Sequence, residues 1–517
     1  MNSRMKERRS VVACATAAVL SALLLWAAYP PHGETCAVLV ALVPLLVAVR
    51  MLRPGRAAAT CFLSGLVFWM LCLSWMPAII KNNGPWPLVL LGWFALSAFC
   101  AGYFAAWGFA AAWIWRLGRR TGGFASVACI FAEAALWALC EYLRATLFTG
   151  FAWNFVGTAF SALPSFATPA RFGSVYLVSA LAVLLDGTFA TLLLRVFAPL
   201  FRASGDDGGS GLDLRPRFPR LLRIAETALP LAAILFCLCI GNGMVRGGRR
   251  HVETIRVALV QRNAPCCFLP GKRERAHEAF AKLIDAVAAA EPDIVVLAES
   301  AMSEFGAVGS FRAQDAARDF LARSGAKSLI AGGDLVENGR TYNVLALYTA
   351  EGEAGAGPVD VYRKQHLVPF GEYIPLDKLV PALQKLSPIG VSLHPGEPKI
   401  FNVPLRNGRS VKVAPLICYE DTDPRLSAKA KDMGAQMIVL ATNDSWFSRS
   451  AEAEAHAAQA VMRAIETGLP VARVGNSGVT GVIRPDGFAT WLSGGSGRPL
   501  VDTAGVMVET VAVDAGM

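Results

Sequence analysis

The amino-acid sequence predicts an α-helical transmembrane bundle of about seven spans, followed by a layered α/β domain. Two observations lead to this prediction. Up to about residue 245, the chain is a succession of long apolar stretches rich in Leu, Ala, Phe and Trp. Residues 251–517 instead have the composition of an ordinary soluble domain, in which short apolar runs alternate with stretches of helical periodicity. We therefore divide the chain into residues 1–245 and residues 246–517.

The overall composition narrows the function classes. Of the 517 residues, 54% are hydrophobic and 17% are charged, and the formal net charge is +10. A basic chain can bind nucleic acid, but here Lys and Arg cluster in short loops between the apolar stretches. That arrangement is the positive-inside pattern of membrane proteins. We therefore expect a membrane partner and no nucleic-acid partner.

The apolar stretches have the length that a membrane requires. A helix needs roughly 20 apolar residues to cross about 30 Å of hydrocarbon. We interpret the first stretch as a retained helix and not a cleaved signal peptide, because no small-residue cleavage site precedes the next one. The predicted spans are residues 11–29, 35–52, 58–80, 86–115, 124–148, 174–200 and 224–243.

The basic residues of the loops predict the orientation of these spans. They lie at the N-terminus and in every second loop, whereas the intervening loops carry only Lys81 and Arg171. Because Lys and Arg stay preferentially in the cytoplasm, the N-terminus is expected there, and seven crossings place residues 246–517 on the far side. The basic residues are Arg4, Lys6, Arg8 and Arg9; Arg50, Arg53 and Arg56; Arg116, Arg119 and Arg120; and Arg202, Arg215, Arg217, Arg220 and Arg223.

Four ionisable residues fall inside predicted spans: Glu133, Glu141, Arg144 and Asp186. Such residues are costly in lipid and are often functional. Glu141 and Arg144 are three positions apart, so they share a helix face and can pair. Two interpretations stay open. The pair is a structural ion pair near the outer interface, or Arg144 and residues 148–154 shape a phospholipid headgroup site.

The second half alternates strands and helices, which is typical of α/β architecture. A long apolar connection at residues 376–398 interrupts this pattern. We interpret it as a lid that touches membrane or acyl chains, with a packed surface loop as the alternative. The expected strands are residues 254–261, 293–299, 328–333, 342–348, 359–362, 412–418, 437–441, 471–474 and 478–484. The expected helices are residues 272–290, 311–323 and 452–467.

A carboxylate, an ammonium and a thiol each close or follow a strand-like run, at Glu299, Lys364 and Cys418. A thiol attacks a carbonyl only as the thiolate, so a base must accept its proton, and Glu299 is the candidate. Lys364 can lower the thiol pKa and stabilise an oxyanion. Each residue alone has an ordinary structural explanation, but the combination predicts an acyl-transfer site.

At these residues the chain resembles the apolipoprotein N-acyltransferases, membrane members of the nitrilase (carbon–nitrogen hydrolase) superfamily. The resemblance covers nearly the full length. It implies an α-β-β-α sandwich on a helical bundle, with Glu299 as base, Lys364 as oxyanion stabiliser and Cys418 as nucleophile. The matching segments are Glu141–Asn154, Lys364–Glu372, Ile417–Glu420, Asn443–Phe447, Arg463–Glu466 and Asn476–Thr480. The implied supporting or substrate-binding residues are Glu372, Tyr419, Glu420, Arg144 and Trp446.

The resemblance also implies the substrates. A phospholipid would give its acyl chain to Cys418, and the diacylglyceryl-cysteine of an apolipoprotein would accept it in a ping-pong reaction, the last step of lipoprotein maturation. The protein would lie in the bacterial inner membrane, with its catalytic domain in the periplasm. Two alternatives stay open: a membrane-tethered amidase that uses the same triad, and a catalytically silent scaffold that binds lipoproteins.

Other features of the sequence predict no further site. There is no phosphate-binding Gly-rich loop and no nucleotide motif, so no cofactor is expected, and the twelve cysteines show no metal-ligand spacing. His366 and His456 are interpreted as structural residues. The family usually adds a transmembrane helix after the nitrilase domain, whereas this chain reaches Met517 without one, which leads us to expect a domain tethered at one point.

Overall fold

In a computed structural model, the chain is described at residues 2–82, 84–121, 124–197, 220–247, 252–264, 273–350, 357–375, 392–447, 450–495 and 497–514. Contacts divide it into two compact units. The first comprises Met1–Pro77 and Pro85–Met244, and the second comprises Ala78–Gly84 and Val245–Met517. Of the predicted lid, only residues 392–398 lie within the described part, and they form no helix or strand.

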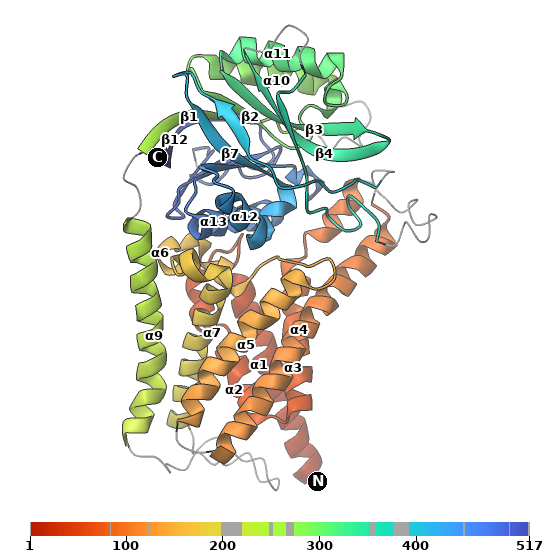
Figure 1. Ribbon diagram of the computed structural model, residues 1–517. Coiled ribbons are helices and arrows are strands. Elements are labelled where there is room, and N and C mark those ends of the chain that lie inside the picture. The colour runs from red at the N-terminus through yellow and green to blue at the C-terminus, as the bar shows by residue number, and fades with distance from the viewer. Residues whose placement is uncertain are drawn as a thin grey trace. The chain divides into compact units, whose positions relative to one another are not determined.

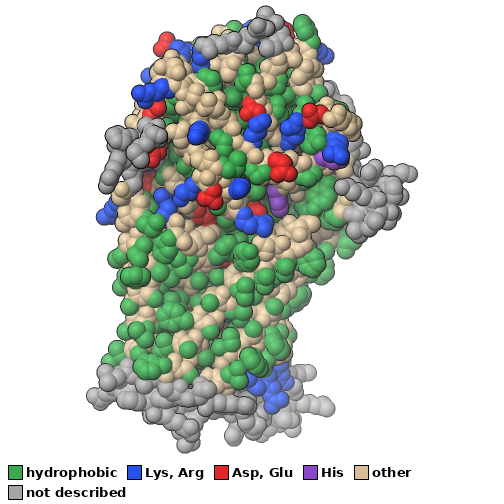
Figure 2. Space-filling model, viewed as in Figure 1, with side chains coloured by type: hydrophobic (Ala, Val, Ile, Leu, Met, Phe, Trp, Pro, Cys, Tyr) green, Lys and Arg blue, Asp and Glu red, His purple; other side chains and the backbone are tan. Residues whose placement is uncertain are grey.

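The first unit is helical, and its long helices run side by side (Figure 1). Figure 2 shows hydrophobic side chains covering the visible face of this unit, as lipid-facing helices require. The helices are α1 (Asn2–Ala27), α2 (Val43–Met51), α3 (Pro54–Cys72), α4 (Trp86–Thr121), α5 (Ala125–Thr146), α6 (Pro164–Ala167), α7 (Ala170–Val196) and α9 (Arg220–Arg246), with 3₁₀ turns η1 (Thr35–Leu39) and η3 (Val156–Ala162). The 3₁₀ turn η2 (Met76–Asn82) begins in this unit, and its residues from Ala78 onward belong to the second unit.

Within the described residues, five helices have the length and composition to cross a membrane. They are Pro54–Asn82, Trp86–Gly118, Ala125–Thr146, Ala170–Val196 and Ile224–Arg246. The two other predicted spans, residues 11–29 and 35–52, correspond to the shorter apolar helices Val11–Ala27 and Thr35–Met51. Several membrane-length helices are therefore present, and the count of seven stays a prediction.

The sequence analysis placed Arg50 in a loop between two spans, and this prediction is wrong. Arg50 lies in α2, not in a loop, and is only 1% exposed. Its guanidinium forms an ion pair with Glu133 of α5 and donates to Thr191 Oγ1 of α7 at 2.8 Å. Trp115 Nε1 of α4 donates to Glu133 Oε2 at 2.6 Å. Paired and hydrogen-bonded in this way, the buried charges join four helices of the unit.

The second unit contains two six-stranded sheets, with strand orders β12-β1-β2-β3-β4-β5 and β11-β10-β9-β8-β7-β6. In each sheet three neighbouring strands are parallel, namely β1, β2 and β3 in one and β7, β8 and β9 in the other. The strands are β1 (Val252–Gln261), β2 (Ile294–Leu297), β3 (Ser328–Glu337), β4 (Arg340–Thr349), β5 (Asp360–Arg363), β6 (Phe401–Pro404), β7 (Ser410–Ile417), β8 (Met437–Thr442), β9 (Val471–Gly475), β10 (Gly481–Ile483), β11 (Ala489–Trp491) and β12 (Gly505–Asp514).

Helices cover the outer faces of the two sheets (Figure 1). They are α10 (Arg273–Ala288), α11 (Phe311–Ser324), α12 (Pro424–Asp432) and α13 (Glu452–Thr467). Side chains of both sheets, such as Val296 and Val439, form one buried apolar core, and Phe280 and Phe320 pack a second core beneath α10 and α11. The predicted α-β-β-α sandwich is therefore confirmed.

Candidate active site

The three predicted catalytic residues directly follow strands of the second unit. Glu299 comes two residues after β2, Lys364 follows β5 and Cys418 follows β7. Glu299 and Lys364 are 8% and 1% exposed, whereas Cys418 is partly exposed. Because β2 and β5 belong to one sheet and β7 to the other, the site draws its groups from both layers of the sandwich.

Lys364 and two carboxylates form a buried cluster. The Lys364 Nζ atom lies 3.5 Å from Glu299 Oε1 and 2.8 Å from Glu372 Oε1. Asn343 of β4 donates to the same two oxygens, at 2.7 Å to Glu299 and 3.0 Å to Glu372. The backbone N–H of Val368 donates to Glu372 Oε2 at 2.9 Å. The structure thus brings Glu299, Lys364 and Glu372 together in hydrogen-bonding contact.

Cys418 has an unusual backbone conformation. Its φ is +50°, in the left-handed region that residues other than Gly, Asn and Asp seldom adopt. It begins the short 3₁₀ turn η6 (Cys418–Thr422) immediately after β7. Strained residues of this kind persist only where the surrounding structure holds them, and they cluster at functional sites.

Glu420 fixes this turn against the Lys364 segment. Its carboxylate accepts hydrogen bonds from the backbone N–H of Ile417 at 2.7 Å and of Gln365 at 2.6 Å. It also accepts from the Tyr362 hydroxyl at 2.8 Å. One fully buried carboxylate therefore ties the residue before the thiol to the residue after the ammonium.

The charges of the site shift its pKa values. Burial raises the pKa of the Cys418 thiol well above its usual value, and Glu299 raises it further, whereas the Lys364 ammonium lowers it. Burial also raises the pKa of Glu299, against the opposing effect of Lys364. Burial alone would lower the pKa of Lys364, but the neighbouring carboxylates, Glu372 before Glu299, raise it overall. The resting site therefore holds a neutral thiol beside a permanent cation, and the thiol needs a base.

Two other predicted residues of this unit lie on segments next to the cluster. Tyr419 follows the thiol, and its ring centroid is 5.4 Å from that of His366. Trp446 belongs to η7 (Asp444–Phe447), and its carbonyl oxygen accepts a hydrogen bond from Asn82 Nδ2 at 2.7 Å. Asn82 is part of the segment Ala78–Gly84, which belongs to the second unit.

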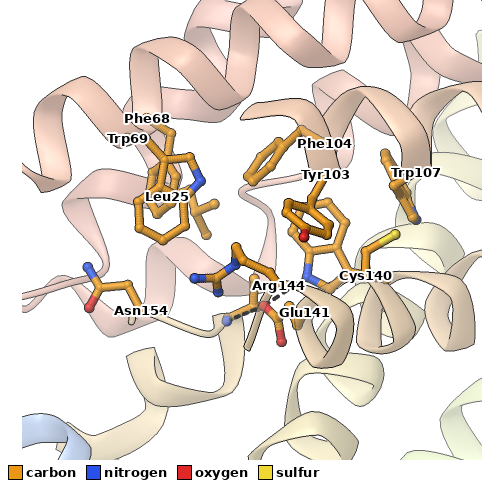
Figure 3. Close-up of a pocket in the computed structure, with 12 residues that line it drawn as sticks. Leu25, Phe68, Trp69, Tyr103, Phe104, Trp107, Cys140, Glu141, Arg144 and Asn154 are labelled. Carbon is orange, nitrogen blue, oxygen red and sulfur yellow. Dashed lines mark hydrogen bonds between the residues drawn. The ribbon is translucent and has the colours of Figure 1, made fainter. Parts of the chain in front are cut away.

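Arg144 lies in the first unit, on α5, and the structure does not bring it into this cluster. Figure 3 shows it in a pocket with Glu141 and a wall of aromatic rings. Its Nη1 donates to the carbonyls of Phe151 at 2.7 Å and Trp153 at 2.8 Å, whereas Glu141 Oε1 accepts from the N–H of Val156 at 2.8 Å. Among the described contacts, Glu141 and Arg144 form no ion pair; both hold the segment after α5.

Two family models match the chain. The apolipoprotein N-acyltransferase N-terminal domain matches residues 21–188, and the carbon-nitrogen hydrolase model matches residues 256–496. The chain is 29% identical to the apolipoprotein N-acyltransferase of Geobacter metallireducens over 90% of this chain and 84% of that protein. It is 28% identical to that of Neisseria meningitidis serogroup A over 84% and 79%, and 26% identical to that of Rickettsia typhi over 68% and 65%.

The two family models together match most of the chain, which is similar over most of its length to the apolipoprotein N-acyltransferases. The chain is therefore an acyltransferase of the membrane, with a nitrilase-type domain. The second unit also matches an amidase from Nesterenkonia sp. AN1, at 17% identity over 50% of this chain and 90% of that one, with a TM-score of 0.36. That score is too low to carry any part of the assignment.

Several polar residues of the site escaped the sequence analysis. Asn343 bridges Glu299 and Glu372, and Tyr362 supports Glu420. Asn343 could have been recognised as a candidate site residue, because it is a polar residue within the apolar run 342–348. Nothing in the sequence marks Tyr362 as a site residue, because a tyrosine on the inner face of a strand is often simply buried in the core.

Proposed function

We propose that this acyltransferase moves an acyl chain from a phospholipid to the α-amino group of the diacylglyceryl-cysteine of an apolipoprotein. The acyl chain would pass through a thioester on Cys418. The observation that supports this is the contact of Lys364 with both Glu299 and Glu372, beside a thiol on a strained turn. The similarity to apolipoprotein N-acyltransferases supports the choice of substrates.

In the first half-reaction, Glu299 accepts the thiol proton and the Cys418 sulfur attacks the carbonyl carbon of the phospholipid ester. The ammonium of Lys364 stabilises the oxyanion of the tetrahedral intermediate. The ester C–O bond then breaks, and the departing alkoxide takes the proton from Glu299. The products are a lysophospholipid and an acyl thioester on Cys418.

In the second half-reaction, the α-amino group of the apolipoprotein attacks the thioester carbonyl. Glu299 takes the proton that the amine loses, and Lys364 again stabilises the oxyanion. The C–S bond breaks, and the thiolate regains a proton from Glu299. The products are an amide and the free thiol. Transfer competes with hydrolysis, so the site must exclude water while the thioester exists.

The supporting residues have positional roles in this proposal. Glu372 keeps Lys364 charged and in place, while Glu420 and Tyr419 belong to the turn that presents the thiol. Trp446 is a candidate for substrate contact. Arg144 supports the segment 151–153, which the sequence suggested as part of a headgroup site.

We also propose the location of the protein. It lies in the bacterial inner membrane with its N-terminus in the cytoplasm and residues 246–517 in the periplasm. The basic residues of alternate loops support this orientation. A periplasmic catalytic domain would meet exported apolipoproteins at the membrane surface.

The proposal is tested by incubating the purified protein with a phospholipid alone and measuring the mass of the peptide that contains Cys418. We expect an added acyl mass, which disappears when a diacylglyceryl-cysteine peptide is supplied and reappears on the amine of that peptide. Cys418→Ala should lose the adduct, whereas Cys36→Ala, which changes an exposed cysteine of the first unit, should keep it. Acyl release as free fatty acid instead of peptide amide would favour a membrane-tethered amidase.

A further inference from the structure

Helix α13 presents two cations to the turn that carries the nucleophile. His456 and Arg463 are seven residues apart, so they lie two turns apart on one helix face. Each is 1% exposed. Arg463 Nη1 donates to the carbonyls of Asp421 at 3.1 Å and Thr422 at 3.0 Å. His456 Nε2 lies 3.3 Å from the carbonyl oxygen of Cys418 itself.

Both ring nitrogens of His456 face carboxylates. Nε2 lies 3.0 Å from Asp421 Oδ1, and Nδ1 lies 3.0 Å from Asp444 Oδ1. An ionised carboxylate only accepts hydrogen bonds, and a neutral imidazole carries a single N–H. Both contacts can be hydrogen bonds only if both nitrogens are protonated. With Asp421 and Asp444 ionised, this geometry requires an imidazolium.

The surrounding charges agree with this protonation state. Burial alone would lower the pKa of His456, but Asp421 and Asp444 raise it to about 10, against the opposing charge of Arg473. Glu452, whose Oε1 lies 3.5 Å from Nδ1, has its own pKa raised well above the usual value by burial, which favours its neutral form. Two anions, Asp421 and Asp444, then face two cations, His456 and Arg473.

This balance argues against a metal ion at the same place. Asp444, Glu452 and His456 offer ligand atoms within 4.8 Å of one another. However, Arg473 Nη2 lies 3.1 Å from Asp444 Oδ2 and would repel a metal cation there. The imidazolium already neutralises the carboxylates that a metal would need.

The network connects to the thiol through one hydroxyl and one charge. Thr442 Oγ1 at the end of β8 donates to Asp444 Oδ1 at 2.8 Å, and the same hydroxyl can instead donate its one proton to the Cys418 sulfur, which lowers the pKa of the thiol. The negative charge of Asp444 acts in the opposite direction and raises the pKa of the thiol. The charge on His456 therefore determines how strongly Asp444 opposes ionisation of Cys418.

We propose that His456, as an imidazolium, is a positioning residue that holds the carbonyl of Cys418 and neutralises Asp421 and Asp444 behind the thiol. This inference rests on the role of Cys418 proposed above. It replaces the interpretation of His456 as an inert core residue. His456 would touch neither the lipid nor the acceptor amine. It would act only by holding the turn η6 and by changing the electrostatic potential at the Cys418 sulfur.

The experiment measures the rate at which iodoacetamide alkylates Cys418 as a function of pH, in the purified full-length protein, by mass spectrometry of its peptide. The charged groups that face the thiol are Glu299, Lys364 and Asp444. In His456→Gln, the carboxylates lose their cation, so we expect the midpoint of the titration to rise by about one pH unit, a tenfold slower reaction below it. His32→Gln, which changes an exposed histidine of the first unit, should leave the midpoint unchanged.

A double variant separates charge from shape. His456→Gln with Asp444→Asn removes one positive and one negative charge, so the midpoint should return toward that of the unchanged protein. An unchanged midpoint in a monodisperse His456→Gln protein would overturn the proposal. Because alkylation needs no lipid, the titration tests His456 separately from acyl transfer.

If His456→Gln does not fold, the unchanged protein still provides a test. Histidines labelled with ¹⁵N distinguish an imidazolium from a neutral ring by their nitrogen shifts. At pH 8 we expect one doubly protonated histidine among the six residues of this type. Six neutral rings at pH 8, or one equivalent of tightly bound metal in the purified protein, would contradict the assignment.

Discussion

At the scale of single residues, the charges of the candidate site converge on Lys364. Two carboxylates contact its ammonium, and their charges more than offset the effect of burial on its pKa. These carboxylates therefore favour the charged form of Lys364. Glu299 can lose and regain a proton beside it, because its own pKa is raised by burial. One fixed charge next to one labile proton is the arrangement that acyl transfer needs.

We expect Lys364→Met to lower the rate of thioester formation by about 10²–10³-fold, the usual cost of losing one oxyanion-stabilising group. It also leaves two carboxylates uncompensated, so the thermal midpoint should fall. Lys399→Met, which removes the partly exposed partner of Asp360, serves as the control and should change neither quantity appreciably. The rate is measured from the mass of the Cys418 peptide over time. A Lys364→Met protein that forms the thioester at the normal rate would exclude the oxyanion role.

The raised pKa of His456 predicts a pH dependence of stability. A histidine that titrates near 6.5 when unfolded and at about 10 when folded stabilises the protein fully below pH 6.5. That contribution is lost as the pH rises toward 10. We expect the thermal midpoint in detergent to fall between pH 7 and 10, and to fall less steeply in His456→Gln. If the thermal midpoint falls equally steeply with pH in the unchanged protein and in His456→Gln, this histidine is not charged in the folded state.

At the scale of elements, the ends of strands from both sheets present the site. The chain after β2 provides Glu299, the chain after β5 provides Lys364, and the chain after β7 provides Cys418. Glu420 joins the last two segments by its hydrogen bonds to Ile417 and Gln365. A shift of one sheet against the other would therefore separate the thiol from the ammonium.

The segment after β9 approaches η7 so closely that only glycine fits. A Cβ atom at Gly478 would overlap with Asp444 Oδ2. We expect Gly478→Ala to displace Asp444, disturb Thr442 and His456, and slow acylation roughly tenfold or more. Gly495→Ala, where a Cβ meets nothing within 4 Å, is the matched control. Equal acylation rates in the two variants would mean that Asp444 has no influence on the thiol.

The sequence predicted the elements that have strong apolar patterns. Residues 342–348 and 359–362 were expected to be strands, and they form β4 and β5, which pair in antiparallel register. The strands β6, β11 and β12 and the helix α12 were not predicted. Strand β12 lies at a sheet edge with half of its positions only partly buried, and α12 has nine residues and begins at Pro424. Short or half-exposed elements carry too little periodicity to be recognised.

The candidate site was partly predictable for a related reason. Glu299, Lys364 and Cys418 are recognisable because reactive groups that follow apolar runs suggest chemistry. The contact of Asn343 with Glu299, and that of His456 with Asp421, depend on how distant segments pack. No local pattern encodes such contacts, so His456 was interpreted as structural.

At the scale of the whole molecule, the similarity to apolipoprotein N-acyltransferases and the apolar helices indicate an acyltransferase of the membrane. The buried charges of Arg50 and Glu133 within the helical unit pair with each other instead of being exposed to lipid. The second unit has the charged surface of a domain in water, as the red and blue side chains over it in Figure 2 show.

The proposed orientation predicts where reporters are active. An enzyme that functions only after export should be active when fused after residue 514. It should be inactive when fused within residues 204–211, which belong to a predicted cytoplasmic loop. A cytoplasmic reporter should give the opposite result at both positions. Export-dependent activity at residues 204–211 would reverse the proposed topology.

The pairing of β12 with β1 also affects how the catalytic domain is made. Strand β1 is the first of its domain, and β12 pairs with it along all ten residues, from Val252 with Asp514 to Gln261 with Gly505. Until residues 505–514 have emerged, one edge of β1 has no partner. In the proposed topology the domain must therefore cross the membrane almost completely before its first sheet can close. Nascent chains should then depend on periplasmic chaperones, because an open edge during this delay favours aggregation.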